Sequence, residues 1–279
     1  MTDPGKTPLE QARHALEAIG RMPEAEIALG SAAIQLGRID APEADWHAAE
    51  ATLTEIARAA AALAPAEGAA RAGALAALLG NGWGFSGDTE DYDHPDNANL
   101  IRVLRRRKGL PVALGIVWLH AARAAGWEAH GVDFPGHFLI ALPGPAGPVA
   151  VDAFDGGTAL PAPALRALLK RVAGPDAELT PDLLRPMGNR AVLLRLANNI
   201  RARRLTAGDL AGALATAEDM LRIAPDAAPL WRETAALHRR LDQVSAALAC
   251  LARYLALVPE GEAAARARAE MAALRARLN

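Results

Sequence analysis

The 279-residue sequence predicts a mainly helical α+β protein, in which a small antiparallel sheet is followed by paired helices. Apolar residues recur at helical spacing along most of the chain. Between about residues 128 and 154 this spacing gives way to short apolar segments separated by Pro and Gly, which is typical of antiparallel strands. The last third contains a 34-residue repeat, and a period of this length predicts helix pairs that stack on one another.

The composition of the sequence divides the chain into three parts. Residues 1–79 are alanine-rich, and apolar residues such as Leu53, Ile56 and Leu63 stand at helical spacing, so we expect three or four helices there. These helices form the N-terminal part of the first predicted domain. Residues 80–188 are expected to form the core of that domain, and residues 189–279 a helical repeat region.

Residues 80–97, GNGWGFSGDTEDYDHPDN, are rich in residues that favour turns, and they predict a long exposed loop. Trp83 and Phe85 are expected to anchor this loop to the domain. Its acidic side chains supply oxygen atoms that cations bind, but their spacing matches neither an EF-hand loop nor a zinc motif. We therefore expect no metal and no cofactor.

Two helices are predicted between this loop and the strand region. The first spans about 98–108, with Asp96 or Asn97 as its N-cap. The second spans 111–125, starts at a proline, and is apolar on all sides, so it is expected to be buried. The predicted strands span about 128–132, 137–142 and 148–154, and a further helix spans about 163–172.

A histidine and a carboxylate fall on adjacent predicted strands. His137 begins the second strand and Asp152 lies on the third, so their side chains are expected to face each other. A carboxylate in this position orients an imidazole and favours its charged form. The pair matches the second and third members of a catalytic triad, and it also fits a purely structural contact. Asp155 is a weaker candidate for the carboxylate because it stands in a Gly-rich turn.

The repeat in the last third has the tetratricopeptide period. Residues 34 positions apart are identical in the pairs Ala213 and Ala247, Leu221 and Leu255, and Pro225 and Pro259. Trp231 stands at the usual aromatic position near the start of the second repeat. Such repeats share a core between neighbouring helix pairs. They can form a peptide-binding groove or serve only as a packing extension, and the sequence favours neither.

Composition excludes several classes of protein. The formal net charge is −2 and 22% of the residues are charged, so we expect neither a disordered chain nor nucleic-acid binding. No apolar stretch approaches the length of a membrane span, and we expect no membrane association. Cys250 is the one cysteine, which is compatible with a reducing compartment, and a cytoplasmic location is expected.

The segments GLPVALGIVWLHAARAAGW, GVDFPGHFLIA and VAVDAFDGG resemble the transglutaminase-like superfamily. The run from Phe85 to Gly157 resembles the bacterial SirB1 family within it. In the superfamily a cysteine nucleophile begins the buried helix in a Gly-x-Cys sequence, and a histidine and an aspartate follow on the next strands. The matching positions here are Gly109-Leu110-Pro111, His137 and Asp152, so proline occupies the nucleophile position. The resemblance implies a papain-type domain followed, as is typical of the SirB1 family, by tetratricopeptide-like repeats.

Proline at the nucleophile position implies a pseudoenzyme, because proline has no nucleophilic atom. Residues 108–127 contain no Ser, Thr or Cys that could replace it, and Cys250 is expected to be a core residue. We therefore expect a non-catalytic regulatory or scaffold protein that binds a protein or peptide through a degenerate cleft and the repeats. The alternative is a hydrolase of amide or isopeptide bonds that uses His137 and Asp152 without a cysteine nucleophile.

Four further residues are candidates for ligand binding. Tyr92, Asn97 and Asn99 recur in the pattern of the SirB1 family, and they either line the cleft or fix the loop to the domain. Arg106 belongs to the basic run Arg105–Lys108, which can contact a phosphate group. Cations are favourable at a helix C-terminus in any case, so this run also has a local explanation.

Overall fold

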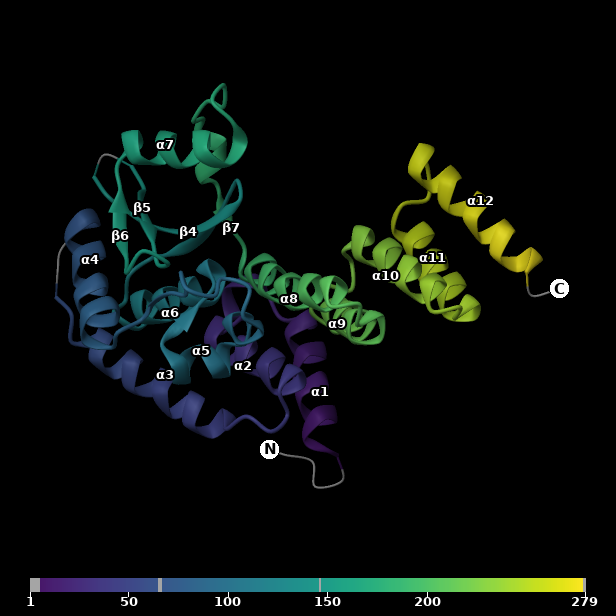
Figure 1. Ribbon diagram of the computed structural model, residues 1–279, viewed down its shortest axis with the longest axis horizontal. Helices are drawn as coiled ribbons and strands as arrows, with labels where there is room; N and C mark the ends of the chain where they lie inside the picture. The colour runs from purple at the N-terminus through teal and green to yellow at the C-terminus, as the bar shows by residue number, and fades with distance from the viewer. Residues whose placement is uncertain (1–5, 65–66, 146, 278–279) are drawn as a thin grey trace. The chain divides into compact units, whose positions relative to one another are not determined.

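The computed structural model describes residues 6–64, 67–145 and 147–277, and the chain folds as two compact units (Figure 1). The first unit comprises Met1–Ala15 and Met22–Leu196, and the second comprises Leu16–Arg21 and Ala197–Asn279. The division between the units falls within the helix Pro8–Arg21 and within the helix Asn189–Thr206. The predicted fold class, mostly helical with a small antiparallel sheet, is confirmed.

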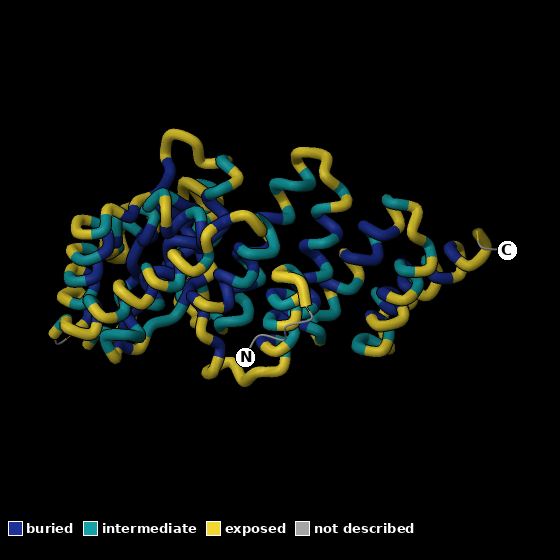
Figure 2. The backbone as a smooth tube through the Cα atoms, turned by 90° about the horizontal axis from the view of Figure 1, so that it is seen from below, coloured by how far each residue is buried: buried dark blue, intermediate teal, exposed yellow. Residues whose placement is uncertain are grey.

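Helices surround a small sheet in the first unit (Figure 1). The α-helices with residues in this unit are α1 (Pro8–Arg21), α2 (Leu29–Asp40), α3 (Trp46–Ala61), α4 (Gly68–Leu75), α5 (Leu100–Arg106), α6 (Pro111–Ala124), α7 (Ala162–Ala173) and α8 (Asn189–Thr206). Helices α1 and α8 also contribute residues to the second unit. The backbone of the first unit is buried in its interior and exposed on the outward faces of its helices (Figure 2).

Helix α6 is the buried helix that the sequence predicts. Pro111 occupies its first turn, where a missing N–H is tolerated, and the residues from Pro111 to Leu119 are all buried. Trp118 is fully buried and makes an edge-on contact with Phe85, with the ring centroids 6.3 Å apart. Gly115 lets the helix approach the sheet, because a Cβ atom there would lie 2.4 Å from Cε1 of Phe138.

The sheet contains five antiparallel strands in the order β6-β5-β4-β3-β7. These are β3 (His130–Phe134), β4 (His137–Leu142), β5 (Val149–Asp152), β6 (Thr158–Leu160) and β7 (Pro186–Met187). The three predicted strands are present, and the two short edge strands are additions. A separate parallel pair consists of β1 (Ser86–Gly87) and β2 (Lys108–Gly109).

Alternation along β4 gives the sheet two apolar faces. Phe138 and Ile140 face α6, since both approach Gly115 of that helix. Leu139 and Ala141 belong to a different cluster, which includes Leu165, Leu168 and Leu169 of α7. Successive strand residues point to opposite faces, so β4 is apolar throughout because it is covered on both sides.

The predicted exposed loop at residues 80–97 is only partly exposed. A π-helix, Ala76–Gly82, enters its beginning, and a 3₁₀ helix, Pro95–Ala98, forms its end. Phe85, Asp88 and Asn97 are buried. The prediction that Phe85 anchors this segment is confirmed, and the prediction of an exposed loop holds for most of its residues but is wrong for Asp88 and Asn97, whose side chains bond to the protein.

The N-cap of α5 also differs from the prediction. Asn99, and neither Asp96 nor Asn97, caps this helix by accepting hydrogen bonds from the amides of Ile101 and Arg102. The sequence at 96–99 offers three residues that favour N-caps, and propensity alone does not choose among them.

The second unit contains two helix pairs related by the predicted repeat. They are α9 (Leu210–Ile223) with α10 (Ala228–Arg240), and α11 (Val244–Leu257) with α12 (Glu262–Ala276). Helix α11 begins and ends 34 residues after α9, as the repeat requires. Trp231 of α10 donates its indole N–H to the carbonyl of Pro225 over 2.8 Å. Within the described residues, none of the helices combines the length and apolar character of a membrane span.

Candidate functional site

His137 and Asp152 contact each other across the sheet, as expected from their adjacent strands. Nε2 of His137 lies 2.9 Å from Oδ2 of Asp152, and the two side chains are 16% and 12% exposed. In this arrangement Nε2–H donates to the carboxylate. The other ring nitrogen, Nδ1, has no hydrogen-bond partner within the described part of the chain. In a neutral imidazole Nδ1 would then be an acceptor for a ligand or a water molecule.

The second oxygen of Asp152 is also engaged. Oδ1 accepts hydrogen bonds from the amides of Phe154, at 2.9 Å, and Asp155, at 3.4 Å. The backbone carbonyl of Asp152 accepts from the amide of Gly157. Asp152 thus holds the turn after β5 as well as the imidazole, while Asp155 is exposed and bonds to Asp152 through its backbone.

Aromatic rings flank the His137 imidazole. The ring of Phe154 lies edge-on to it at 6.2 Å, and Tyr92 lies 5.8 Å from Phe154. Tyr92 is 48% exposed, so its ring forms part of the protein surface beside the pair. Phe154 was not among the predicted site residues. Its position two residues after Asp152 could have indicated that it lies close to the pair.

Arg195 is a second neighbour that the sequence did not predict. It donates from Nη2 to the backbone carbonyl of His137 over 2.9 Å, and it forms an ion pair with Asp133. Burial lowers the pKa of the Arg195 guanidinium. These contacts join α8 to β3 and β4 over some 60 residues of sequence, and no local sequence pattern predicts them.

A residue without a nucleophilic atom stands at the nucleophile position of the superfamily. Pro111 is buried at the start of α6, where the superfamily has its cysteine. Cys250 lies in the second unit, in an apolar cluster that includes Leu251 and Tyr254. Burial, and then the charge of Glu218, raise the pKa of the Cys250 thiol to about 11. A thiol with this pKa stays protonated at neutral pH and is a poor nucleophile.

The predicted binding residues Asn97 and Arg106 belong to one buried network with Asp88. Arg106 donates from Nη2 to Oδ2 of Asp88 over 2.9 Å and from Nη1 to Oδ1 of Asn97 over 2.8 Å. Nδ2 of Asn97 donates to the carbonyls of Asp91 and Tyr92. The network therefore fixes the segment that carries Tyr92. Asp88 stood in the acidic stretch of the sequence, but nothing there distinguished it from its neighbours.

The Asp88 carboxylate is ionised more readily than an ordinary aspartate. Burial works against its charge, but hydrogen bonds from the Asp91 amide, Asn97 and Arg106 outweigh burial and hold the pKa of Asp88 below its usual range.

Asn99 serves the fold on the other side of this segment. Besides capping α5, it donates from Nδ2 to the carbonyl of Gly37 and to the carboxylate of Asp40. These bonds tie α5 to α2. Among the described residues, no group of three or more His, Cys, Asp or Glu side chains is arranged to hold a metal ion.

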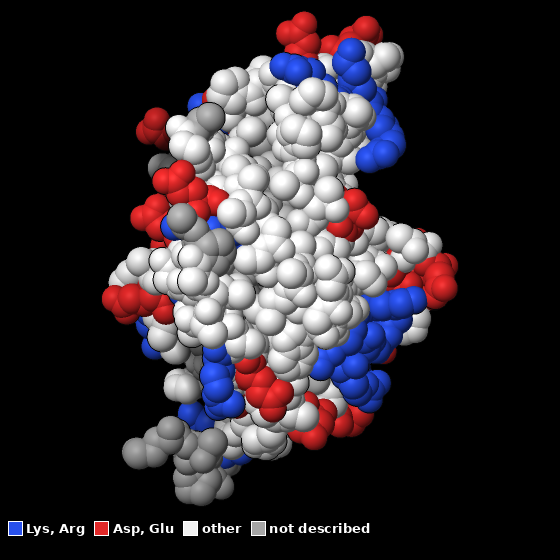
Figure 3. Space-filling view, turned by 90° about the vertical axis from the view of Figure 1, so that its left-hand side faces the viewer, with Lys and Arg blue, Asp and Glu red and all other residues white. Residues whose placement is uncertain are grey.

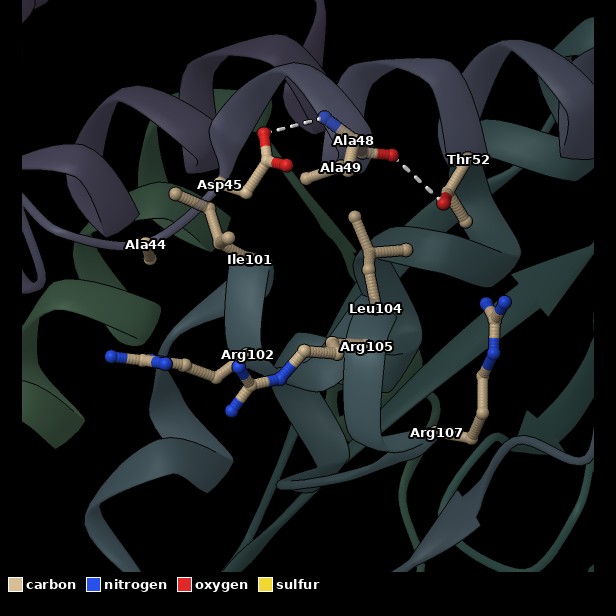
Figure 4. A pocket seen from close by; sticks show the side chains of 10 residues that line it. All are labelled: Ala44, Asp45, Ala48, Ala49, Thr52, Ile101, Arg102, Leu104, Arg105 and Arg107. Carbon is tan, nitrogen blue, oxygen red and sulfur yellow. Dashed lines mark hydrogen bonds between the residues drawn. The ribbon is translucent and has the colours of Figure 1, made fainter.

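A cleft of about 330 Å³ lies between α3 and α5, beside the basic run (Figure 4). Apart from the exposed Arg105, its charged side chains are engaged within the protein. Asp45 caps α3 by accepting from the amide of Ala48, and Arg102 pairs with Glu43. Arg107 lies over the rings of Trp83 and Phe85, at 4.7 and 4.8 Å from their centroids. Arg102 and Arg107 therefore interact with side chains of the protein itself, and their presence in this cleft does not require a bound anion.

An apolar groove of about 590 Å³ lies between α4, β6 and α7. Leu160, Leu165 and Leu184 contribute to it, and among the described residues of its lining Glu67 alone is charged. On this side of the molecule, uncharged atoms cover the centre of the surface and charged side chains stand towards its margins (Figure 3).

The helix–sheet arrangement with its His–Asp pair defines a protein of the transglutaminase-like type, and comparisons agree. Residues 47–198 match the model of the transglutaminase-like superfamily, and residues 200–275 match a tetratricopeptide repeat model. The chain belongs to the transglutaminase-like superfamily and carries tetratricopeptide repeats after that domain, which confirms the predicted resemblance.

Several bacterial proteins named UPF0162 are similar to this chain. One from Xylella fastidiosa is 33% identical over 63% of this chain and 64% of its own length. One from Pseudomonas aeruginosa is 34% identical over 57% of this chain and 58% of its own length. UPF0162 protein YchA of Escherichia coli is 28% identical over 67% and 69%, respectively. The chain thus matches somewhat less than two thirds of the length of the first two relatives.

Proposed function

We propose that this chain is a non-catalytic regulatory or scaffold protein, which binds a protein or peptide partner through its degenerate transglutaminase-like cleft and its repeats. The observation that carries the proposal is Pro111, a residue without a nucleophilic atom, at the start of the buried helix. A base and an orienting acid without a nucleophile cannot form the covalent intermediate of the superfamily.

The repeats support the binding half of this proposal. Tetratricopeptide repeats generally mediate interactions between proteins. Stacked helix pairs of this kind offer extended surfaces for such partners. In the first unit, the exposed ring of Tyr92 beside His137 and Phe154 supplies a surface of the aromatic kind that is enriched where proteins bind partners.

The contacts of Asp152 support the non-catalytic half. Both carboxylate oxygens are used, one by His137 and one by the turn that follows β5. We propose that the pair holds this turn and the neighbouring aromatic rings in place for a partner. Asn97 and Arg106 are proposed to act in the same way, by fixing the segment that carries Tyr92, and Asn99 is proposed to act indirectly, by holding α5 against α2.

We expect no turnover of peptide or isopeptide substrates by the purified chain, and none by a His137→Ala variant. The assay would monitor cleavage of peptide and isopeptide libraries by mass spectrometry. His47→Ala, which removes an exposed histidine, is the matched control. Turnover that His137→Ala abolishes and His47→Ala preserves would overturn the non-catalytic proposal.

That outcome would instead support a hydrolase, the second candidate function. The 2.9 Å contact between His137 and Asp152 favours it, since an imidazole held in this way can take a proton from a water molecule. General-base catalysis of this kind contributes about two to four decades in rate.

Partner binding should depend on the aromatic surface of the first unit. We expect a Tyr92→Ala variant to retain less of the partner in affinity capture from a native lysate than the unchanged chain retains. Val172→Ala, at another exposed apolar residue, is the control and should retain the partner fully. If the unchanged chain, Tyr92→Ala and Val172→Ala captured equal amounts of partner, binding would be assigned to a surface other than the one that carries Tyr92.

A further inference from the structure

A cavity of about 530 Å³ lies in the first unit, apart from the His137 site. It opens to the surface and is lined by the segment before α2, the C-terminal half of α6 and the start of α8. The polar side chains in its lining are Glu26, His120, Arg123 and Asn189. The volume falls within the range of small-molecule sites, which combine an apolar lining with a few converging polar groups. None of these residues takes part in the contacts of His137 and Asp152.

Arg123 is a partly buried cation without an acidic partner. Its Nη2 donates to the carbonyl of Ala129 over 3.2 Å and to Oδ1 of Asn189 over 2.8 Å, and both acceptors are neutral. Within the described residues no carboxylate lies at ion-pair distance from this guanidinium. Arg102, Arg106 and Arg195 differ in this respect, since each pairs with an aspartate or glutamate.

The absence of a counter-ion has a physical consequence. Burial lowers the pKa of Arg123, and no neighbouring negative charge opposes this effect. A buried charge is unfavourable unless a partner compensates it. Arginine also presents its donors in a planar fork that matches carboxylate and phosphate groups. An anion in the cavity would supply the compensation that the protein itself does not.

Asn189 holds the guanidinium in a fixed position. Nδ2 of Asn189 donates to the carbonyls of Glu24 and Ile27, over 2.9 and 3.2 Å, so Oδ1 is the atom left to accept from Arg123. A donor that is fixed in advance loses less entropy when it binds a ligand.

His120, one turn before Arg123 on α6, provides a second polar group. Its Nε2 lies 2.9 Å from the carbonyl of Leu53, so Nε2 carries the proton and donates. The other nitrogen, Nδ1, has no partner within the described part of the chain. Gly30 leaves room beside it, since a Cβ atom at Gly30 would stand 3.3 Å from Nδ1.

The first turn of α2 adds to the positive character of the cavity. Ala28 is the N-cap residue and offers no side-chain hydrogen bond, and Ala28, Leu29 and Gly30 all contribute to the lining. Uncapped amides at a helix start favour an anion. Glu26 is the acidic residue of the lining, but it is exposed, so water and salt screen its charge.

We propose that this cavity binds a small metabolite through an oxyanion group, either phosphate or carboxylate, with Arg123 as the counter-ion and Nδ1 of His120 as an acceptor for a hydroxyl or other donor group of the same ligand. The site is separate from the cleft of the proposed function, so either proposal can hold without the other.

Isothermal titration of the full chain with inorganic phosphate and with acetate, at constant ionic strength, tests the proposal and distinguishes the two oxyanions. We expect saturable one-to-one binding of at least one of them. Arg123→Gln should weaken it by about tenfold or more, since a hydrogen bond to a charged group contributes that much to affinity. Arg166→Gln, at an exposed arginine of α7 that lines neither pocket, should leave it unchanged.

A second variant keeps the test valid if Arg123→Gln unfolds, since Arg123 also holds Ala129 and Asn189. Ala28→Asp places a favourable N-cap on α2, so its Tm should be unchanged or higher, while its carboxylate should compete with the ligand and abolish binding. Saturable binding that survives in both variants would overturn the proposal. Absence of binding of both anions to the unchanged chain would overturn it too.

Discussion

Trp118→Ala is expected to lower the free energy of unfolding by about 3 to 5 kcal/mol, the range for removing a large aromatic side chain from a core. Trp118 is fully buried in α6 and contacts the ring of Phe85. Its indole lies so close to the chain after β5 that a Cβ atom at Gly157 would stand 2.8 Å from Nε1. The surrounding backbone therefore has little freedom to move into the space that the Trp118→Ala substitution leaves. Denaturant unfolding followed by circular dichroism measures the loss.

Trp118→Phe is the informative control for this prediction. The indole Nε1 is buried and has no hydrogen-bond partner among the described residues. Phenylalanine removes this unsatisfied donor together with part of the ring, and the two effects oppose each other. We expect Trp118→Phe to lower the free energy of unfolding clearly less than Trp118→Ala does. A loss as large as that of Trp118→Ala would mean that Nε1 has a partner in solution, such as a water molecule.

Asp88→Ala is expected to lower the free energy of unfolding by about 3 kcal/mol, the low end of the range for breaking a buried ion pair. The Asp88 side chain is 3% exposed, and its substitution would leave Nη2 of Arg106 and the Asp91 amide without their acceptor. Arg106 is 22% exposed and can be partly hydrated, which places the loss at the low end. Urea unfolding of the variant and the unchanged chain measures the difference.

The same carboxylate predicts a dependence of stability on pH. Because the pKa of Asp88 is lower in the folded than in the unfolded chain, its stabilisation is present above the ordinary pKa of aspartate. That stabilisation disappears as the pH falls through the lowered folded pKa. The stability difference between the unchanged chain and Asp88→Ala should therefore narrow in acid. A difference that stays constant with pH would contradict the role of the charge.

Glu90→Gln is the matched control for Asp88→Ala. Glu90 lies in the same segment and pairs with Lys108 over 2.7 Å, but its side chain is 82% exposed. Exposed ion pairs of this kind contribute little to stability. We expect the variant to unfold like the unchanged chain, which would show that burial, and not acidity alone, makes Asp88 important.

Much of the fold could be predicted from the sequence because its strongest signals are periodic. The buried helix after Gly109 has apolar residues on all sides, and the repeat recurs at a fixed spacing, so α6 and the pairs α9–α10 and α11–α12 follow directly. The strands β6 and β7 have too few residues for an alternating pattern. They form because they pair with the neighbouring strands β5 and β3, respectively.

The candidate site also contains contacts that the sequence predicts and contacts that it does not. The contact of His137 with Asp152 could be predicted because adjacent antiparallel strands bring such residues together. The network of Asp88, Asn97 and Arg106 could not, since it depends on the path of a segment with no regular pattern. The contact of Arg195 with the His137 carbonyl spans 58 residues and depends on how α8 packs against the sheet.

The strand order of the sheet has a consequence for how the chain behaves at high concentration. The two outer strands are only three and two residues long, and one of them contains Pro186, which has no N–H to offer. An edge of this kind presents few free backbone groups to a neighbouring molecule. The apolar β4 strand, which would be prone to aggregation if it lay at an edge, is thereby shielded from intermolecular pairing.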